Sequence, residues 1–476
     1  MKKLRLALLI FLTFLKRYFK KLSGNIFVFL KFKYFVVLIF IIFSLFILIK
    51  YFIPYFNQTT ISEGFIGVYT NNNLPPTITN LLSESLVEID EKGIPKPKLA
   101  EKWDTNKEFN TYTFKLKDNL FWNDGSKIQS SDIKFNLPDL NVKYPDSTSI
   151  EFKLVDSFSP FPTFLINPIF KDKTLVGVGK YILDSEEITK GFISKMILKP
   201  KDKNQNLPVI IIRFYPDEKT AKTAFDLGEV DSLIGVSEIT SYKSNPNNIL
   251  KQIQVFNKIL AIFYNTKDNI LSDKNFRRAL SFSAPEIKGE ERAKTSFPSS
   301  SWAFNETVKD YLGNIETAKS YFDKVEKGKN DTLILTTTPT FSTLGETIVK
   351  SWKELGVNAV LRIESGVPQN FQALLIQQSI PLDPDQYTLW HSTQSNTNIS
   401  NYSSPRIDKD LEDGRKTGDI EIRKEKYADF QRVLLDDAPA TFLYFPKYNV
   451  IYRKKIENNI NTVLSIQIPQ IKMNLN

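Results

Sequence analysis

The chain of 476 residues contains no cysteine and a single histidine, His391. Without cysteine it cannot form disulfides, use a thiol in catalysis, bind a metal through thiolates or carry a lipid-modified cysteine. One imidazole without a second histidine makes a poor transition-metal site. We therefore expect neither a bound metal nor a cofactor, and we expect His391 to be exposed to solvent or to cap a loop.

Acidic residues are missing from residues 1–56, which hold ten of the 63 lysines and arginines. The other 53 basic residues equal the 53 acidic ones in number, so the net charge of +10 belongs to the N-terminal segment. A surface that follows a nucleic-acid backbone needs clustered cations on the folded part of a protein. We therefore expect no nucleic-acid partner.

Charged residues are also missing from the run YFVVLIFIIFSLFILI between Lys33 and Lys50, and apolar residues continue to Phe56. Residues 34–56 are long enough to cross a bilayer if Lys50 reaches toward the outer headgroups. The sequence therefore predicts a single-pass anchor through the lipid bilayer at residues 34–56.

The positive charge gives this anchor a direction. Nine basic residues precede the apolar run, and the first one after Lys50 is Lys92. Because positive charge stays on the cytoplasmic side, we expect the N-terminus inside the cell and residues 57–476 outside the membrane. Residues 1–33 then form a basic cytoplasmic or interfacial segment, in which the apolar stretch LALLIFLTFL is too short to span.

Catalytic signatures are absent as well. The sequence has no G-x-S-x-G motif, no phosphate-binding loop and no zinc triad. The adjacent carboxylates Asp436 and Asp437 lie on a predicted helix, where neighbouring side chains diverge by about 100° and do not face each other. We therefore expect a protein that is not an enzyme.

Periodic patterns predict an α/β fold. Residues 111–117 (TYTFKLK) alternate as a half-buried strand does. A helix at 218–227 is expected to end at Gly228, and a strand, a helix and a strand between residues 333 and 363 form a plausible parallel βαβ unit. Other expected elements are strands at 65–69, 209–214 and 260–264, and helices at 273–284, around 315–325 and at 419–436.

Several motifs resemble the bacterial extracellular solute-binding proteins of family 5, which bind oligopeptides, dipeptides or nickel for ABC transporters. Residues 99–135 are similar to the family's LAxxW opening, YTFxLR strand, W-x-DG turn and AxDV helix start. Further resemblances follow in the family's order. They are GVGKYIL (177–183), AFDLGEVD (224–231), IFYNTKDNILSDKNFRRALSFS (262–283), NISNYSSPRIDKDLEDGRKT (398–417) and APATFLYFP (438–446).

The resemblance implies a two-lobed fold like that of periplasmic binding proteins, of type II and similar to cluster C. Lobe 1 would hold residues 57–258 and the returning segment 445–476, and lobe 2 residues 259–444. Only about 15 residues separate the AxDV-like segment from the next strand, so the family's extra subdomain is expected to be reduced or lost. We expect a monomeric ectodomain.

The resemblance also implies a function. The chain would bind a small solute or a peptide outside the cytoplasm and present it to the permease subunits of an ABC importer. The alternative on the same scaffold is a membrane-anchored ligand sensor or a chaperone-like peptide-binding module.

Candidate ligand contacts lie in two loop-like segments. Trp302, Tyr387 and Trp390 are in segments that the family places near its cleft, although local packing explains each of them equally well. Peptide-binding members carry an aspartate three residues before an acidic-Pro step, here Asp383-Pro384, and Ile380 stands at that position. A peptide ammonium would then be buried without a partner, unless Asp383 or Asp385 takes the aspartate's place.

Overall fold

The computed structural model describes residues 59–469 except 136–139, 173, 204, 238, 244, 327, 367 and 369. It also describes Thr13, Arg17, Val37, Ile39, Phe40, Phe43 and Ser44. The chain forms two compact units, Met1–Thr59 and Thr60–Asn476. Apart from those seven residues, the expected segment 1–33 and the expected anchor 34–56 lie outside the described residues. Among the residues that are described, no helix has both the length and the apolar character that crossing a membrane requires.

The first sheet of the larger unit has seven strands in the order β12-β19-β11-β1-β10-β9-β8. Its centre is β1, which pairs in parallel with β10 and with β11. Ile61, Phe65 and Ile212 are buried and contribute to its core. The strands are β1 (Thr60–Ile66), β8 (Tyr181–Thr189), β9 (Phe192–Pro200), β10 (Val209–Tyr215), β11 (Ser232–Ile234), β12 (Asn248–Gln254) and β19 (Lys447–Arg453).

Helix α5 (Glu218–Leu227) connects β10 to β11, and both of its ends follow from the sequence. The Asp217 carboxylate accepts a hydrogen bond from the Thr220 N–H at 2.8 Å, which caps the first turn. The helix ends at Gly228, whose φ of 81° lies in the left-handed region that favours glycine. The predicted helix at 218–227 is confirmed.

The second sheet has six strands in the order β14-β18-β13-β17-β15-β16. After the exposed Lys258, its strand β13 (KILAIFY) has only apolar and aromatic side chains, because both of its faces are covered. Leu260 and Ile262 pack on one side, and Ile259 and Phe263 pack on the other. The strands are β13 (Lys258–Tyr264), β14 (Glu291–Arg292), β15 (Leu333–Thr337), β16 (Ala359–Ile363), β17 (Ala373–Ser379) and β18 (Ala440–Phe445).

Helices cover both faces of this second sheet, with α7, α8 and α9 on one side and α11 and α12 on the other. Strands β15 and β16 are parallel, which confirms the predicted βαβ unit with α9 between them. The helices of the larger unit are α4 (Pro76–Leu82), α5, α6 (Thr240–Lys243), α7 (Lys274–Ser283), α8 (Ile315–Phe322), α9 (Ser342–Leu355), α10 (Tyr387–Trp390), α11 (Pro405–Lys416), α12 (Ile420–Asp437) and α13 (Glu457–Gln467).

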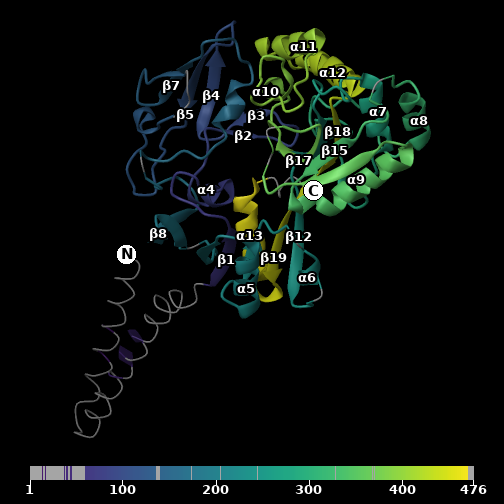
Figure 1. Cartoon of the computed structure of the whole chain (residues 1–476). Helices are drawn as coiled ribbons and strands as arrows, with labels where there is room; N and C mark the ends of the chain where they lie inside the picture. The colour runs from purple at the N-terminus through teal and green to yellow at the C-terminus, as the bar shows by residue number, and fades with distance from the viewer. Residues whose placement is uncertain are drawn as a thin grey trace. The chain divides into compact units, whose positions relative to one another are not determined.

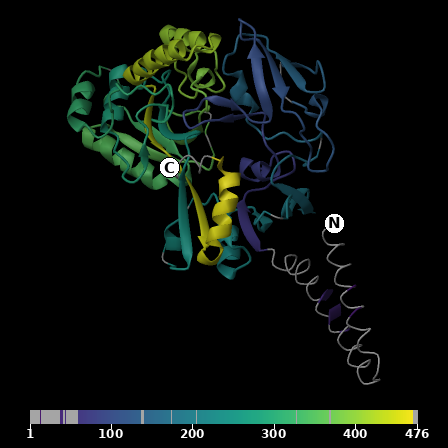
Figure 2. The same ribbon diagram turned by 180° about the vertical axis from the view of Figure 1, so that it is seen from behind.

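A third sheet has the strand order β4-β5-β7-β6 and belongs to residues 84–178, here called the four-stranded subdomain. Its core includes Phe114, Trp122 and Phe152. In Figures 1 and 2 this subdomain lies beside α10 and α11, away from β12 and β19. Its strands are β2 (Val87–Ile89) and β3 (Pro95–Pro97), which form a separate hairpin, and β4 (Ala100–Thr105), β5 (Thr111–Leu116), β6 (Asn141–Lys143) and β7 (Ser149–Lys153).

The chain passes between the first and second sheets at two places. Residues 255–257 join β12 to β13, and Pro446 joins β18 to β19. The two crossings touch each other, since the Val255 N–H donates a hydrogen bond to the Pro446 carbonyl at 3.3 Å. The sheets are therefore linked by two adjacent short segments of chain.

Two sequence expectations need correction. The strand expected at 65–69 begins earlier, as β1 (Thr60–Ile66). The helix expected around 315–325 ends earlier, as α8 (Ile315–Phe322), and Ile315 is 39% exposed because it stands in the first turn of that helix. Residues 84–178 carry a four-stranded sheet, and the expectation that the family's extra subdomain is reduced or lost stays a prediction.

Candidate ligand-binding site

The loop that follows β17 carries three of the six predicted site residues, Ile380, Asp383 and Asp385. The sheet fixes the start of this loop because the first residues of β17 are buried. The Ile380 N–H donates a hydrogen bond to the carbonyl of Asn257 at 2.9 Å. The loop is thereby attached to one of the two crossings between the sheets. Residues 380–386 then lead into the short helix α10.

Asp383 is 4% exposed and is paired with an arginine of helix α12. Its Oδ1 lies 2.5 Å from an Nη of Arg423 and accepts the Asp385 N–H at 2.8 Å. Burial, the largest single effect, acts to lower the pKa of Arg423, but the attractions and hydrogen bonds of Asp383 and Tyr427 together outweigh burial and raise that pKa. Asp383 and Arg423 therefore form a buried ion pair.

Asp385 is also buried, and its partner comes from the end of helix α11. Its Oδ2 lies 2.8 Å from an Nη of Arg415, and its Oδ1 accepts the Tyr387 N–H at 3.2 Å. Burial raises the pKa of Asp385, and the charge of Arg415 acts in the opposite direction. Both aspartates of the loop thus have an arginine partner.

Aromatic rings cover the two arginines. The Trp302 ring lies 5.0 Å from the Arg423 guanidinium carbon, and the Tyr387 ring lies 4.1 Å from that of Arg415. Such contacts favour a cation that is shielded from water. Trp302, Asp383, Asp385, Tyr387, Arg415 and Arg423 together are called the charged cluster below.

His391 packs at the edge of the charged cluster. Its ring stacks on Tyr387 with 4.0 Å between the centroids, and its Nε2 lies 3.3 Å from the Glu412 carboxylate. The imidazole is buried, so the expectation of an exposed histidine is wrong. Its Nδ1 lies 2.8 Å from the Thr393 hydroxyl, a local contact of the kind expected of a residue that caps a loop.

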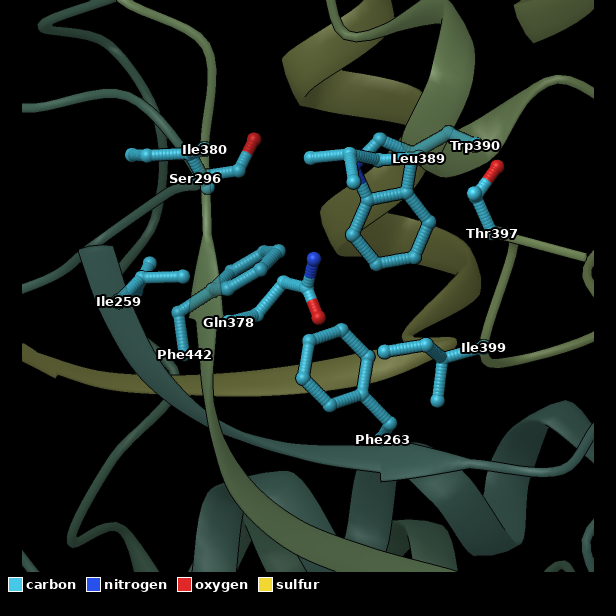
Figure 3. A pocket seen from close by; sticks show the side chains of 10 residues that line it. All are labelled: Ile259, Phe263, Ser296, Gln378, Ile380, Leu389, Trp390, Thr397, Ile399 and Phe442. Carbon is cyan, nitrogen blue, oxygen red and sulfur yellow. The ribbon is translucent and has the colours of Figure 1, made fainter. Parts of the chain in front are cut away.

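Ile380 and Trp390 line an apolar cavity beside the second sheet. Figure 3 shows their side chains together with Ile259, Phe263 and Phe442, which come from β13 and β18. The cavity is small: it leaves about 10 Å³ for the centre of a water molecule. It therefore has room for about one water. A solute would enter only after these side chains moved.

The structure therefore divides the six predicted site residues between two places. Four of them lie in the charged cluster, and Ile380 and Trp390 line the cavity. Arg415 and Arg423 were not predicted as site residues. Arg415 is 30 residues from its partner Asp385, and Arg423 is 40 residues from Asp383. No local sequence pattern indicates pairs at such separations. The only sequence signal was the spacing of four residues that places Arg423 beside Tyr427 on a helix.

A sequence model described as "Bacterial extracellular solute-binding proteins, family 5 Middle" matches residues 95–157 and 136–401 of the chain. Among curated proteins, the "Dipeptide-binding protein" of Escherichia coli (strain K12) is 22% identical over 451 residues. The match covers 76% of this chain and 83% of that relative.

Solved structures of similar fold include a substrate-binding protein of an ABC transporter, CtaP, from Listeria monocytogenes. It has a TM-score of 0.70 at 19% identity and covers 83% of this chain and 94% of its own. NikZ from Campylobacter jejuni, solved in complex with Ni(L-His), has a TM-score of 0.67 at 21% identity with the same coverage. At these identities the likeness concerns the fold.

Proposed function

Because the chain belongs to the bacterial extracellular solute-binding proteins of family 5, we propose that it is a membrane-anchored receptor that delivers a peptide-like solute to an ABC importer. Proteins of this family are binding receptors and not enzymes. The observation that carries the proposal is the family match across residues 95–401. The permease subunits of the importer are the proposed partners, and the ectodomain acts as a monomer.

The proposed receptor closes on its ligand with two lobes, residues 57–258 with 445–476 and residues 259–444. In support, the chain changes sheets between β12 and β13 and again between β18 and β19. Two adjacent short segments can absorb a rotation through a few backbone angles, as hinges between domains do. The loop of the candidate site is attached to this hinge through Ile380 and Asn257.

The proposed anchor is residues 34–56, with the N-terminus in the cytoplasm and the ectodomain outside the membrane. The apolar run and the positive charge before it support this topology. The side chains of Val37, Phe40 and Phe43 are 53%, 69% and 60% exposed, at a spacing of three residues. Apolar side chains exposed in this way suit a lipid environment better than water.

The proposed ligand is a neutral solute or a peptide whose amino terminus is blocked. Ile380 cannot pair with an ammonium group, and the carboxylates of Asp383 and Asp385 are already paired with arginines. A free amine would have to displace an arginine or remain unpaired. Leaving one charge of a buried pair without its partner costs roughly 3–5 kcal/mol, a large part of the roughly 8 kcal/mol of micromolar binding.

A thermal-shift screen of the full chain in detergent, against peptides, sugars and metal chelates, tests the proposal. A ligand should raise the melting temperature in a saturable manner. Calorimetry with each peptide hit and its N-acetylated form then tests the ligand class, and the acetylated form should bind at least as tightly. Tight binding of a free peptide that disappears on acetylation would contradict the proposed ligand class. A screen without any saturable ligand would contradict the receptor itself.

A further inference from the structure

The four-stranded subdomain touches the second lobe on the side away from the proposed hinge. The Ser159 N–H donates a hydrogen bond to the carbonyl of Arg415 at 2.8 Å. In the same region, the Trp302 N–H donates a hydrogen bond to the carbonyl of Lys92, in the turn between β2 and β3, at 3.0 Å. Two backbone hydrogen bonds therefore join the four-stranded subdomain to the second lobe. The two could move apart without breaking the pairing between any two strands of a sheet.

The side chain of Arg415 lies at the centre of this contact. Its guanidinium carbon is 4.8 Å from the Phe158 ring of the subdomain and 4.1 Å from the Tyr387 ring of the second lobe. Its Nη is paired with the buried carboxylate of Asp385 at 2.8 Å. Arg415 thus holds a ring of the subdomain against the loop that carries the candidate site.

Other atoms of the same surface are close but make no directional bond. A methylene group added to Gly418 would lie 2.6 Å from the ring of Phe109, so the turn before α12 is tightly packed on the subdomain. Arg423 also acts electrostatically on Tyr112 of the subdomain, opposing the burial that raises the pKa of Tyr112 to about 12. Arg415 combines an ion pair within the second lobe with a ring contact and a backbone hydrogen bond to the subdomain.

We infer that Arg415 is a latch. It fastens the four-stranded subdomain to the second lobe, and the lobes separate for ligand exchange only when this contact is released. The subdomain is continuous with the first lobe through residues 82–84 and 177–181, where Gly179 donates a hydrogen bond to the Leu82 carbonyl at 2.8 Å. A rotation at the hinge therefore carries the subdomain with the first lobe and pulls Phe158 and Ser159 away from α11.

The absence of native cysteine allows a direct measurement of this contact in the full chain in detergent. Spin labels at Lys102→Cys on β4 and Lys424→Cys on α12, both exposed positions, report the distance across the interface. In the chain with no other substitution, pulsed electron–electron double resonance should give a narrow distribution of distances between the two labels. Arg415→Ala should broaden it and add a longer component. Phe158→Leu, which keeps the partner of Asp385, should act in the same direction.

The matched control is Arg406→Ala on the same helix. Arg406 pairs with Asp429 at 2.6 Å, but its side chain is 60% exposed and its partner lies within the second lobe. This variant should leave the distribution unchanged. Unchanged distributions in both Arg415→Ala and Phe158→Leu, with melting temperatures close to that of the parent chain, would overturn the latch. Equal broadening in Arg406→Ala would overturn it too. The measurement needs no ligand, so its outcome is independent of the proposed receptor function.

Discussion

Single side chains of the loop after β17 decide what the candidate site can bind. The sequence predicts Asp383 and Asp385 as alternative anchors for an ammonium group, but no pattern in it indicates that both are already paired. Their partners Arg423 and Arg415 come from helices far along the chain. Such pairing depends on how helices dock on a sheet. Residue types and spacing therefore predict that a carboxylate is present but not whether it is free.

Replacing Asp383 tests the importance of its buried pair. Asp383→Asn should lower the free energy of unfolding by about 3–5 kcal/mol, because Arg423 keeps its charge but loses its partner. The exposed pair of Glu187 and Lys195, at 2.7 Å, is the control. Glu187→Gln should cost much less, because solvent screens an exposed ion pair. Urea denaturation measures both, and equal losses would show that Asp383 does not need its partner.

Ile380 lies in an apolar cavity, and this placement predicts the effect of a charge there. Ile380→Asp should destabilise the chain by several kcal/mol, roughly the cost of burying a charged group without a partner. Ile380→Val, which removes one methyl group, should cost about 0.5–1.5 kcal/mol. Chemical denaturation distinguishes the two variants. If Ile380→Asp and Ile380→Val lower the free energy of unfolding equally, position 380 opens toward solvent or ligand.

Elements whose signals are local were predicted well. The helix at 218–227 has a capping aspartate and a terminal glycine, and the βαβ unit at 333–363 has a strand, an amphipathic helix and a strand in short succession. Helix α13 gave a weaker signal and was not predicted. It is held by a long-range contact, because the Gln467 amide donates a hydrogen bond to the buried carboxyl of Glu63 on β1 at 2.6 Å.

This contact makes the docking of α13 on the first sheet dependent on pH. Burial raises the pKa of Glu63 from 4.5 to about 7, against the smaller opposing effect of the bond from Gln467. The folded state therefore holds a proton that the unfolded chain has lost above pH 4.5. The nearby titratable groups Tyr181 and Tyr448, whose pKa values burial raises, stay neutral throughout this range.

The stabilising effect of protonated Glu63 is complete below pH 4.5 and is lost as the pH rises toward 7. It amounts to roughly 3 kcal/mol, at about 1.4 kcal/mol for each pKa unit. Melting temperatures of the parent chain should fall between pH 5 and pH 8 more steeply than those of Glu63→Gln. The exposed variant Glu187→Gln should keep the parent's slope. If the melting temperature of Glu63→Gln falls with pH as steeply as that of the parent chain, other groups cause the pH dependence.

For the whole molecule, the α/β class and the family were accessible from colinear motifs. The division of the predicted site between a charged cluster and a separate cavity was not. Both places are built from strands and helices that are distant in sequence, so their separation appears only when the sheets are assembled. The same holds for the contact between the four-stranded subdomain and α11.

The proposed topology predicts how intact cells respond to protease. After removal of the cell wall, residues 57–476 should be digested without lysis, because the positive charge of residues 1–33 keeps the N-terminus inside. An antibody against an epitope added before Lys2 should detect a protected fragment. Protection of the ectodomain until lysis would contradict the topology, while leaving the binding proposal open to its own test.

The central claim is that the chain binds a peptide-like solute without changing it. Native mass spectrometry of the full chain, mixed with equal amounts of free-amine and N-acetylated tetrapeptides, tests this claim directly. The account predicts adducts of one intact peptide for each chain, with acetylated peptides favoured and their masses unchanged after prolonged incubation. Shortened peptides that accumulate beyond the amount of protein, or a chain that retains none of the peptides, would contradict it.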